Sequence, residues 1–318
     1  MQINMISETK NEKSENIWVE ILTFIVLFVV LEAIKGIITF IPVFYELTSN
    51  LFSAIFSGEE FLDAVTEITS AIVSKPSVTI TMLFSCAVTI IGVLFICRRI
   101  KKRPYSSIGI VKKNAFKNLL IGMLLGLIPL LVAYLILFVG GYTGSIMFNG
   151  FDYLLILFFF GFLVQSSSEE FLMRGYFMNG LAAASNIPVA IILNSVVFMA
   201  LHLSNPGATV ISMVNIFAFG LVASLLFLLT ENIWIVSGMH FFWNFASGCL
   251  LGSNVSGTRT LSLFTVPLLG EDLFAGGDFG IEGSVVTTVI FSVFAIVLLV
   301  FVIRKRNSAA AVPQQEII

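Results

Sequence analysis

Ionisable side chains are rare inside the long apolar stretches of this sequence, and they are its candidates for chemistry, together with an asparagine one helical turn after a histidine. A charged residue near the centre of a lipid bilayer costs about 2.5–3.5 kcal/mol on insertion scales, so each such residue is a functional-site hypothesis. Histidine is scarcer still, with 2 copies among 318 residues. The candidates, in chain order, are Glu32, Lys35, Glu169, Glu170, Arg174, His202, His240 and Asn244.

Two pairs among these candidates have the helical spacing of neutralising ion pairs. Glu32 and Lys35 lie three residues apart with the acid first, which indicates a structural pair. Glu170 and Arg174 lie four residues apart in the same order. Glu169 then faces about 100° away around the helix, without an intrahelical cation, so we predict that it is the freer carboxylate.

Four of the candidates are of the types that hydrolyse a peptide bond with water. A carboxylate shielded from bulk water can accept a proton from a water molecule at neutral pH, and Glu169 is the candidate for this general base. Histidine rings and an asparagine amide can donate hydrogen bonds to the oxyanion of a tetrahedral intermediate, each worth about 2.7–4 kcal/mol. His202, His240 and Asn244 are the candidates for these donors.

The same residue types also allow a metal-dependent reaction. Two histidines and a glutamate form a catalytic zinc ligand set that leaves one position open for water. The sequence has no HExxH motif, in which both histidines share one helix turn. A zinc site would therefore have to be assembled from Glu169, His202 and His240 on three different helices, and the residues leave both chemistries open.

The elements that must position these residues are transmembrane helices. Of the chain, 58% is hydrophobic and 11% charged, whereas soluble domains carry roughly 25% charged residues. A backbone in lipid must satisfy its hydrogen bonds internally, so we expect an all-α, polytopic transmembrane helix bundle. The apolar runs predict about eight spans, at residues 17–45, 77–97, 118–141, 151–183, 186–203, 208–230, 232–252 and 283–303.

The distribution of charges orients these spans. Eight of the 17 basic residues lie at 98–117, between the second and third spans, and three more lie at 304–306, after the last span. The positive-inside rule places both segments in the cytoplasm, which agrees with two cytoplasmic termini. The acidic loops at 46–67 and 271–282 are then outside, and residues 57–68 fit an amphipathic helix that begins with a capping box.

The predicted spans let the four candidate groups meet at similar depths. Glu169 lies about 21 Å from the cytoplasmic end of its span at 1.5 Å per residue, and His202, on the returning span, lies about 24 Å from that end. His240 and Asn244 follow at about 12 and 18 Å on one face of the seventh span. We therefore expect one polar cavity. In the alternative, each histidine packs between helices with a hydrogen bond of its own.

Three short motifs carry a resemblance to a known family. Residues 169–174 read EEFLMR and fit EExxxR, residues 198–202 read FMALH and fit FxxxH, and residues 240–244 read HFFWN and fit HxxxN. In this order they resemble the CPBP (CAAX protease and bacteriocin-processing) family of intramembrane proteases. This family includes the type II CAAX prenyl endopeptidases and bacteriocin-immunity proteins. The resemblance covers about residues 115–252.

We accordingly divide the chain into three parts. Residues 1–114 hold the N-terminal spans, the outer amphipathic helix and the basic cytoplasmic loop. Residues 115–252 form the CPBP-like core, and residues 253–318 hold the outer loop, the last span and the cytoplasmic tail.

The resemblance implies a role for each motif residue. Glu169 would activate water, His202, His240 and Asn244 would orient the water or form the oxyanion site, and Glu170 with Arg174 would support them. The family is often labelled metalloprotease, so zinc is the cofactor to expect if there is one. The implied activity is endopeptidase cleavage of a membrane-associated substrate, either prenylated or a peptide precursor, by a multi-pass protein of a bacterial plasma membrane. Nucleic acid is not an expected partner.

Two other classes of function remain open from the sequence. Intramembrane glutamate and histidine residues also form proton relays, so the chain could be a proton-coupled transporter. Transporters usually carry internal repeats, and none is evident in this sequence. The third hypothesis is a non-catalytic bacteriocin self-immunity or scaffold protein that keeps the family's fold.

Overall fold

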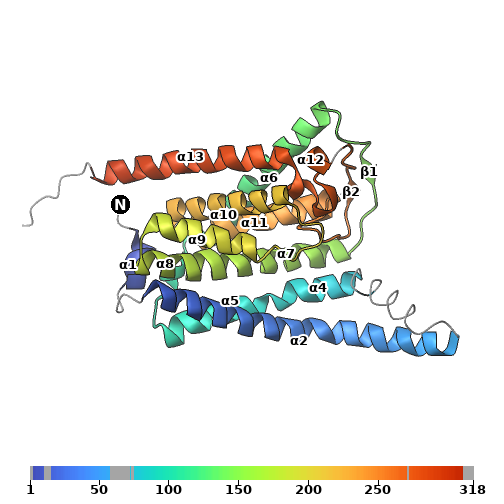
Figure 1. Cartoon of the computed structure of the whole chain (residues 1–318), viewed down its shortest axis with the longest axis horizontal. Coiled ribbons are helices and arrows are strands. Elements are labelled where there is room, and N and C mark those ends of the chain that lie inside the picture. Colours follow the sequence, from blue (N-terminus) through green and yellow to red (C-terminus); the bar gives the residue numbers. More distant parts are fainter. Residues whose placement is uncertain (1–2, 11–15, 58–71, 73–74, 271, 311–318) are drawn as a thin grey trace, which may run out of the picture.

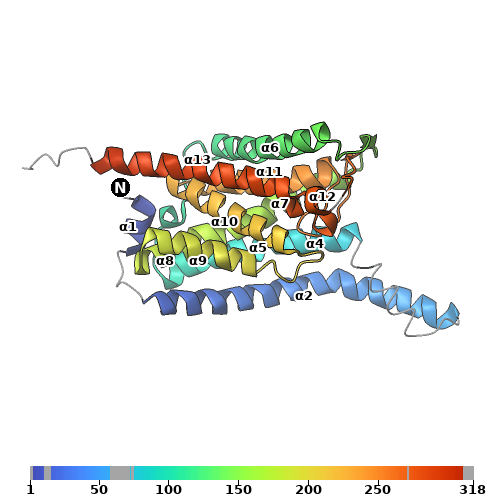
Figure 2. The same cartoon turned by 45° about the horizontal axis from the view of Figure 1, so that its top comes forward.

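The structure is a computed structural model that describes residues 3–10, 16–57, 72, 75–270 and 272–310. It is a bundle of helices that run roughly along one common direction (Figures 1 and 2). The expected all-α, polytopic class is confirmed. The amphipathic helix predicted at 57–68 lies, beyond its first residue, outside the described part of the chain.

Six helical segments among the described residues are long and apolar enough to cross a membrane. They lie in α2 (Ile17–Ser57), α4 (Pro76–Ser85) with α5 (Ala87–Phe95) and the π-helix η1 (Ile96–Ile100), α6 (Ala115–Val139), α7 (Leu154–Glu170) with the π-helix η3 (Phe171–Met178) and α8 (Asn179–Ala184), α10 (Val210–Thr230) and α13 (Val285–Ala310).

The remaining two of the eight expected spans are shorter helices. The fifth is α9 (Ile187–Ala200), whose 14 residues end before a turn that contains His202. The seventh is α11 (Ile233–Phe245), continued by the π-helix η4 (Ala246–Leu250). For α11, polar residues explain the difference, since His240 and Asn244 lower the hydropathy of this segment and nearly all of the helix is buried among other helices.

The beginning of the first span, α2, and the end of the last span, α13, lie at the same end of the bundle, as an even number of spans requires (Figures 1 and 2). Near that end, Nζ of Lys305 on α13 donates to the carbonyl oxygen of Leu229 on α10 at 2.8 Å. The short helices α1 (Asn4–Lys10) and η2 (Tyr105–Ile108) lie at the same end, in mutual contact.

Glycine residues allow α6 to approach α11 closely. A Cβ atom on Gly122 would lie 2.1 Å from the carbonyl oxygen of Ile235, and one on Gly126 would lie 2.2 Å from that of Met239. From the α11 side, a Cβ on Gly238 would lie 2.3 Å from the carbonyl oxygen of Leu119. The two backbones therefore touch, and this contact fixes the helix that carries His240 and Asn244.

At the opposite end of the bundle, the segment between α11 and α13 folds back on the helices. It pairs β2 (Phe264–Thr265) with β1 (Met147–Phe148) in an antiparallel ribbon and contains α12 (Asp272–Ala275), η5 (Gly277–Phe279) and η6 (Ile281–Gly283). Glu282, which we predicted in an outer acidic loop, is only 5% exposed. Its carboxylate accepts from Nε1 of Trp243 at 2.9 Å and from both N and Oγ of Ser256 at 2.8 Å. The loop is thereby tied to α11.

Candidate active site

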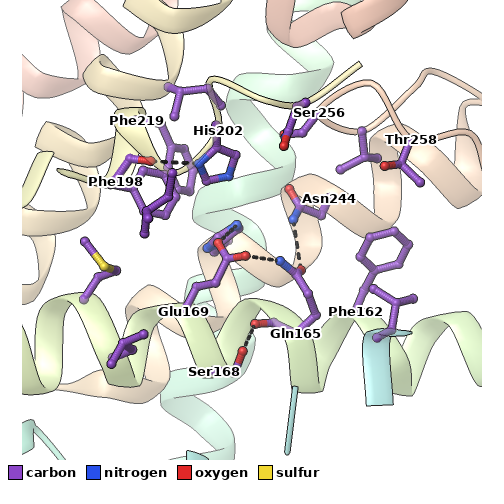
Figure 3. A pocket seen from close by; sticks show the side chains of 18 of the residues that line it. Phe162, Gln165, Ser168, Glu169, Phe198, His202, Phe219, Asn244, Ser256 and Thr258 are labelled. Carbon is purple, nitrogen blue, oxygen red and sulfur yellow. Dashed lines mark hydrogen bonds and ion pairs between the residues drawn. The ribbon is translucent and has the colours of Figure 1, made fainter. Parts of the chain in front are cut away.

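A cavity of about 340 Å³ opens between the helices, and the three sequence motifs meet at it (Figure 3). Glu169 at the end of α7, His202 after α9, and His240 and Asn244 on α11 all line it. Apolar side chains, among them Phe162 of α7, form much of the remaining wall. The structure thus brings all four predicted water-handling residues to one space.

Glu170 and Arg174 lie behind this cavity and do not line it. Both side chains are fully buried, and Nη1 of Arg174 donates to Oε1 of Glu170 at 2.9 Å. The guanidinium also donates to the carbonyl oxygen of Gly220 at 3.5 Å and stacks over Phe198, with Cζ 4.4 Å from the ring centroid. The predicted ion pair is confirmed, and it joins the EExxxR and FxxxH motifs through the ring of Phe198.

His240 contacts both glutamates of the EExxxR motif. Its Nδ1 lies 2.8 Å from Oε1 of Glu170, and its Nε2 lies 3.8 Å from Oε2 of Glu169. Because a carboxylate only accepts hydrogen bonds, Nδ1 must carry the proton. A neutral His240 therefore presents an unprotonated Nε2 toward Glu169 and the cavity. The ring also packs edge-on against Phe219 at a centroid distance of 4.8 Å.

The protonation of a neutral His202, which lies just after α9, is fixed in the same way. Its Nδ1 lies 2.8 Å from the carbonyl oxygen of Phe198, one turn earlier, and that oxygen can only accept (Figure 3). A neutral His202 is then unprotonated at Nε2. As neutral rings, both histidines would accept a hydrogen from water, and they become oxyanion donors only when they are charged.

A chain of side-chain hydrogen bonds links Glu169 to Asn244. Nε2 of Gln165 donates to Oε1 of Glu169 at 2.5 Å, and Nδ2 of Asn244 lies 3.4 Å from Oε1 of Gln165 (Figure 3). Nδ2 of Asn244 is also 3.4 Å from Oγ of Ser166. Oε2 of Glu169 is buried and accepts no hydrogen bond from the described residues. Such a buried oxygen calls for a water or another group from the cavity.

Sequence reasoning missed two features of this site. Gln165 lies one helical turn before Glu169, a spacing from which the contact could have been predicted. The second feature is the pair on α2. Nζ of Lys35 and Oε1 of Glu32 are 2.7 Å apart, which confirms the predicted pair, but both residues also line the cavity. The α2 helix therefore forms one wall of the site.

Glu169, His202 and His240 carry atoms of the types that bind zinc. The chemistry of two unprotonated Nε2 atoms and one free carboxylate oxygen suits zinc. However, the described residues contain no group of three His, Cys, Asp or Glu side chains close enough to hold a metal ion. Glu169 and His240 approach each other, but in the described part of the chain no third His, Cys, Asp or Glu side chain lies where it could bind the same ion. The arrangement therefore does not fit a three-ligand zinc site.

The family comparison points to the same residues. The family model of "Type II CAAX prenyl endopeptidase Rce1-like" proteins matches residues 151–246, which include all three motifs. No curated protein and no solved structure matches the chain. The matched segment runs from the start of α7 to the end of α11, the part of the fold that supplies Glu169, His202, His240 and Asn244. Residues 151–246 therefore resemble the CAAX-type intramembrane proteases of the CPBP family, in agreement with the resemblance that the three motifs carry.

Proposed function

We propose that this protein is an intramembrane endopeptidase in which Glu169 activates a water molecule. The observation that carries the proposal is the position of the Glu169 carboxylate, which faces Nε2 of His240 at 3.8 Å in a cavity shared with His202 and Asn244. A carboxylate and an unprotonated imidazole nitrogen can each take one hydrogen of a single water molecule, which points its oxygen at a substrate carbonyl.

The reaction then follows from the groups at hand. The water oxygen forms a bond to the carbonyl carbon while its proton passes to Glu169. The amide of Asn244, the one neutral donor among the four residues, stabilises the oxyanion. Glu169 returns its proton to the amide nitrogen, the C–N bond breaks, and a carboxylate and an amine are released. A histidine that becomes protonated along this path can add a second donor.

The substrate class follows from the surroundings of the cavity. Its walls are formed by helices of a membrane bundle and are partly apolar, so a membrane-associated protein or peptide suits it better than a freely soluble one. A prenylated protein and a peptide precursor are both of this kind. We also propose that the protein spans a bacterial plasma membrane several times and cleaves its substrate from the cytoplasmic side.

The proposal is tested by comparing the peptides released by membranes that contain wild-type protein with those released by Glu169→Ala and Glu169→Gln membranes. We expect peptides that appear only with the wild type, while all three proteins are inserted in equal amounts. Equal peptide release from all three would refute it. Uptake or pH-gradient-driven flux in proteoliposomes that survives loss of both histidines would instead favour a transporter. Phenotypic rescue by the Glu169→Ala protein would favour a non-catalytic immunity role.

Zinc dependence is measured on the same samples. If a metal participates, zinc should copurify with the wild type near one equivalent and fall on His202→Ala or His240→Ala substitution. If activity survives complete metal removal by a chelator, the hydrolysis depends on Glu169 and the protein's own donors.

A further inference from the structure

We infer that Gln165 is a positioning residue of this site, which fixes the orientation of the Glu169 carboxylate and couples it to Asn244. The inference rests on the proposed function, because it assigns a role within the same hydrolysis. Gln165 belongs to none of the three motifs and lines the cavity directly. It is the residue that joins the α7 carboxylate to the α11 amide (Figure 3).

The hydrogen bonds leave the Gln165 amide a single orientation. Its NH2 group donates to Oε1 of Glu169 at 2.5 Å. Its oxygen accepts from Oγ of Ser166 at 3.0 Å and lies 3.4 Å from Nδ2 of Asn244. A flipped amide would place its oxygen against the carboxylate and its NH2 group against the NH2 group of Asn244. Both contacts would be repulsive, so the observed orientation is the stable one.

In this orientation, the Gln165 amide binds one oxygen of the Glu169 carboxylate and restrains its rotation. Oε1 of Glu169 is held by Gln165, and Oε2 is turned toward Nε2 of His240. Without the amide, the carboxylate of Glu169 could rotate about its terminal bond, which is a broad and nearly free torsion. Loss of Gln165 would therefore spread Glu169 over several orientations, of which few place a water on the substrate carbonyl.

The same amide also sets the resting position of Asn244. The two Nδ2 contacts of Asn244, to Gln165 and Ser166, are long at 3.4 Å. A donor held by long hydrogen bonds is oriented but easily released to a stronger acceptor, such as an oxyanion. The side chain of Gln165 therefore orients both the base, Glu169, and the oxyanion donor, Asn244.

The test is the Gln165→Met variant, which keeps the length of the side chain and removes its polar atoms. We expect kcat for a peptide that the wild type cleaves to fall on the order of 10- to 100-fold with KM nearly unchanged, since a misplaced catalytic group slows chemistry rather than binding. Asn194→Leu is the matched control. Asn194 is likewise an amide between helices, fully buried and bonded to Oγ of Ser224 at 3.1 Å, but it does not line the cavity.

A double-mutant cycle separates positioning from simple packing. In an Asn244→Ala background, the loss caused by Gln165→Met should shrink, because part of the Gln165 effect passes through Asn244. An unchanged kcat in Gln165→Met, or a loss equal to that of Asn194→Leu, would overturn the inference while wild-type activity upholds the proposed function. A wild type that cleaves nothing refutes the proposed function itself, and this role of Gln165 falls with it.

Discussion

Nδ1 of His240 lies 2.8 Å from Oε1 of Glu170, the same oxygen that accepts from Nη1 of Arg174 at 2.9 Å. One buried carboxylate oxygen therefore joins a histidine of α11 to an arginine of η3. Glu170 orients the ring of His240 from outside the cavity, and Arg174 neutralises the buried carboxylate. The two adjacent glutamates thus have separate positions, with Glu169 in the cavity and Glu170 behind it.

Arg174→Met should be severely destabilising because it leaves the carboxylate of Glu170 buried without its cation. Removing one partner of a buried ion pair typically costs about 3–5 kcal/mol. Thermal unfolding of the detergent-solubilised protein measures this loss. Arg304→Gln, at an exposed position of α13, is the control and should change stability by less than about 0.5 kcal/mol. Equal melting temperatures for the two variants would contradict this function of Arg174.

Gly126→Val should force α6 away from α11. Its Cβ would lie 2.2 Å from the carbonyl oxygen of Met239 and 3.0 Å from the backbone nitrogen of Trp243, and backbone atoms cannot move aside cheaply. Overpacking of this kind costs about 1–3 kcal/mol or more and would displace the helix of His240. The control is Gly36→Ala on α2, where a Cβ would meet nothing within 4 Å. We expect Gly36→Ala to melt at or slightly above the wild-type temperature.

How much of this site the sequence predicts depends on whether a contact is local. The pairs of Glu32 with Lys35 and of Glu170 with Arg174 follow from helical spacing, and both form as predicted. Gln165 and Glu169 share the four-residue spacing of Glu170 and Arg174, but glutamine carries no charge and forms no ion pair, so this contact was not predicted.

Contacts between distant parts of the chain could not be predicted in this way. The position of α2 at the cavity wall depends on how helices pack, which the apolar pattern of a membrane chain does not encode. Glu282 is a second example, because 39 residues separate it from Trp243 and an acidic loop residue ordinarily faces water. The π-helical continuation of α7 directly after Glu170 was also not predicted, although such segments often accompany functional sites.

Glu282→Leu should loosen the loop between α11 and α13. Nε1 of Trp243 and the backbone and hydroxyl groups of Ser256 would lose their acceptor, at about 1–3 kcal/mol for each group left buried and unpaired. Ser256 has a positive φ of 47°, a conformation that needs such support. Limited proteolysis should cut this loop faster in Glu282→Leu than in the wild type. Arg259→Gln, exposed in the same loop, should be cut at the wild-type rate.

Lys35→Met should destabilise the protein, and adding Glu32→Leu should restore part of the loss. The single variant leaves a carboxylate without its cation inside a membrane helix, whereas the double variant leaves no charge to compensate. The melting temperature of the double variant is expected to exceed that of Lys35→Met. If instead the double variant is the less stable of the two, the pair contributes more than mutual neutralisation.

The most direct test of the proposed hydrolysis is the initial rate of peptide release by purified Glu169→Gln protein in proteoliposomes. The substitution keeps the size of the side chain and removes the base, so general-base loss should lower kcat by about 10²–10⁴-fold. We predict that the variant folds and inserts like the wild type and releases peptide at no more than about a hundredth of its rate. A Glu169→Gln protein that cleaves the same substrate at the wild-type rate would contradict the assignment of Glu169 as the base.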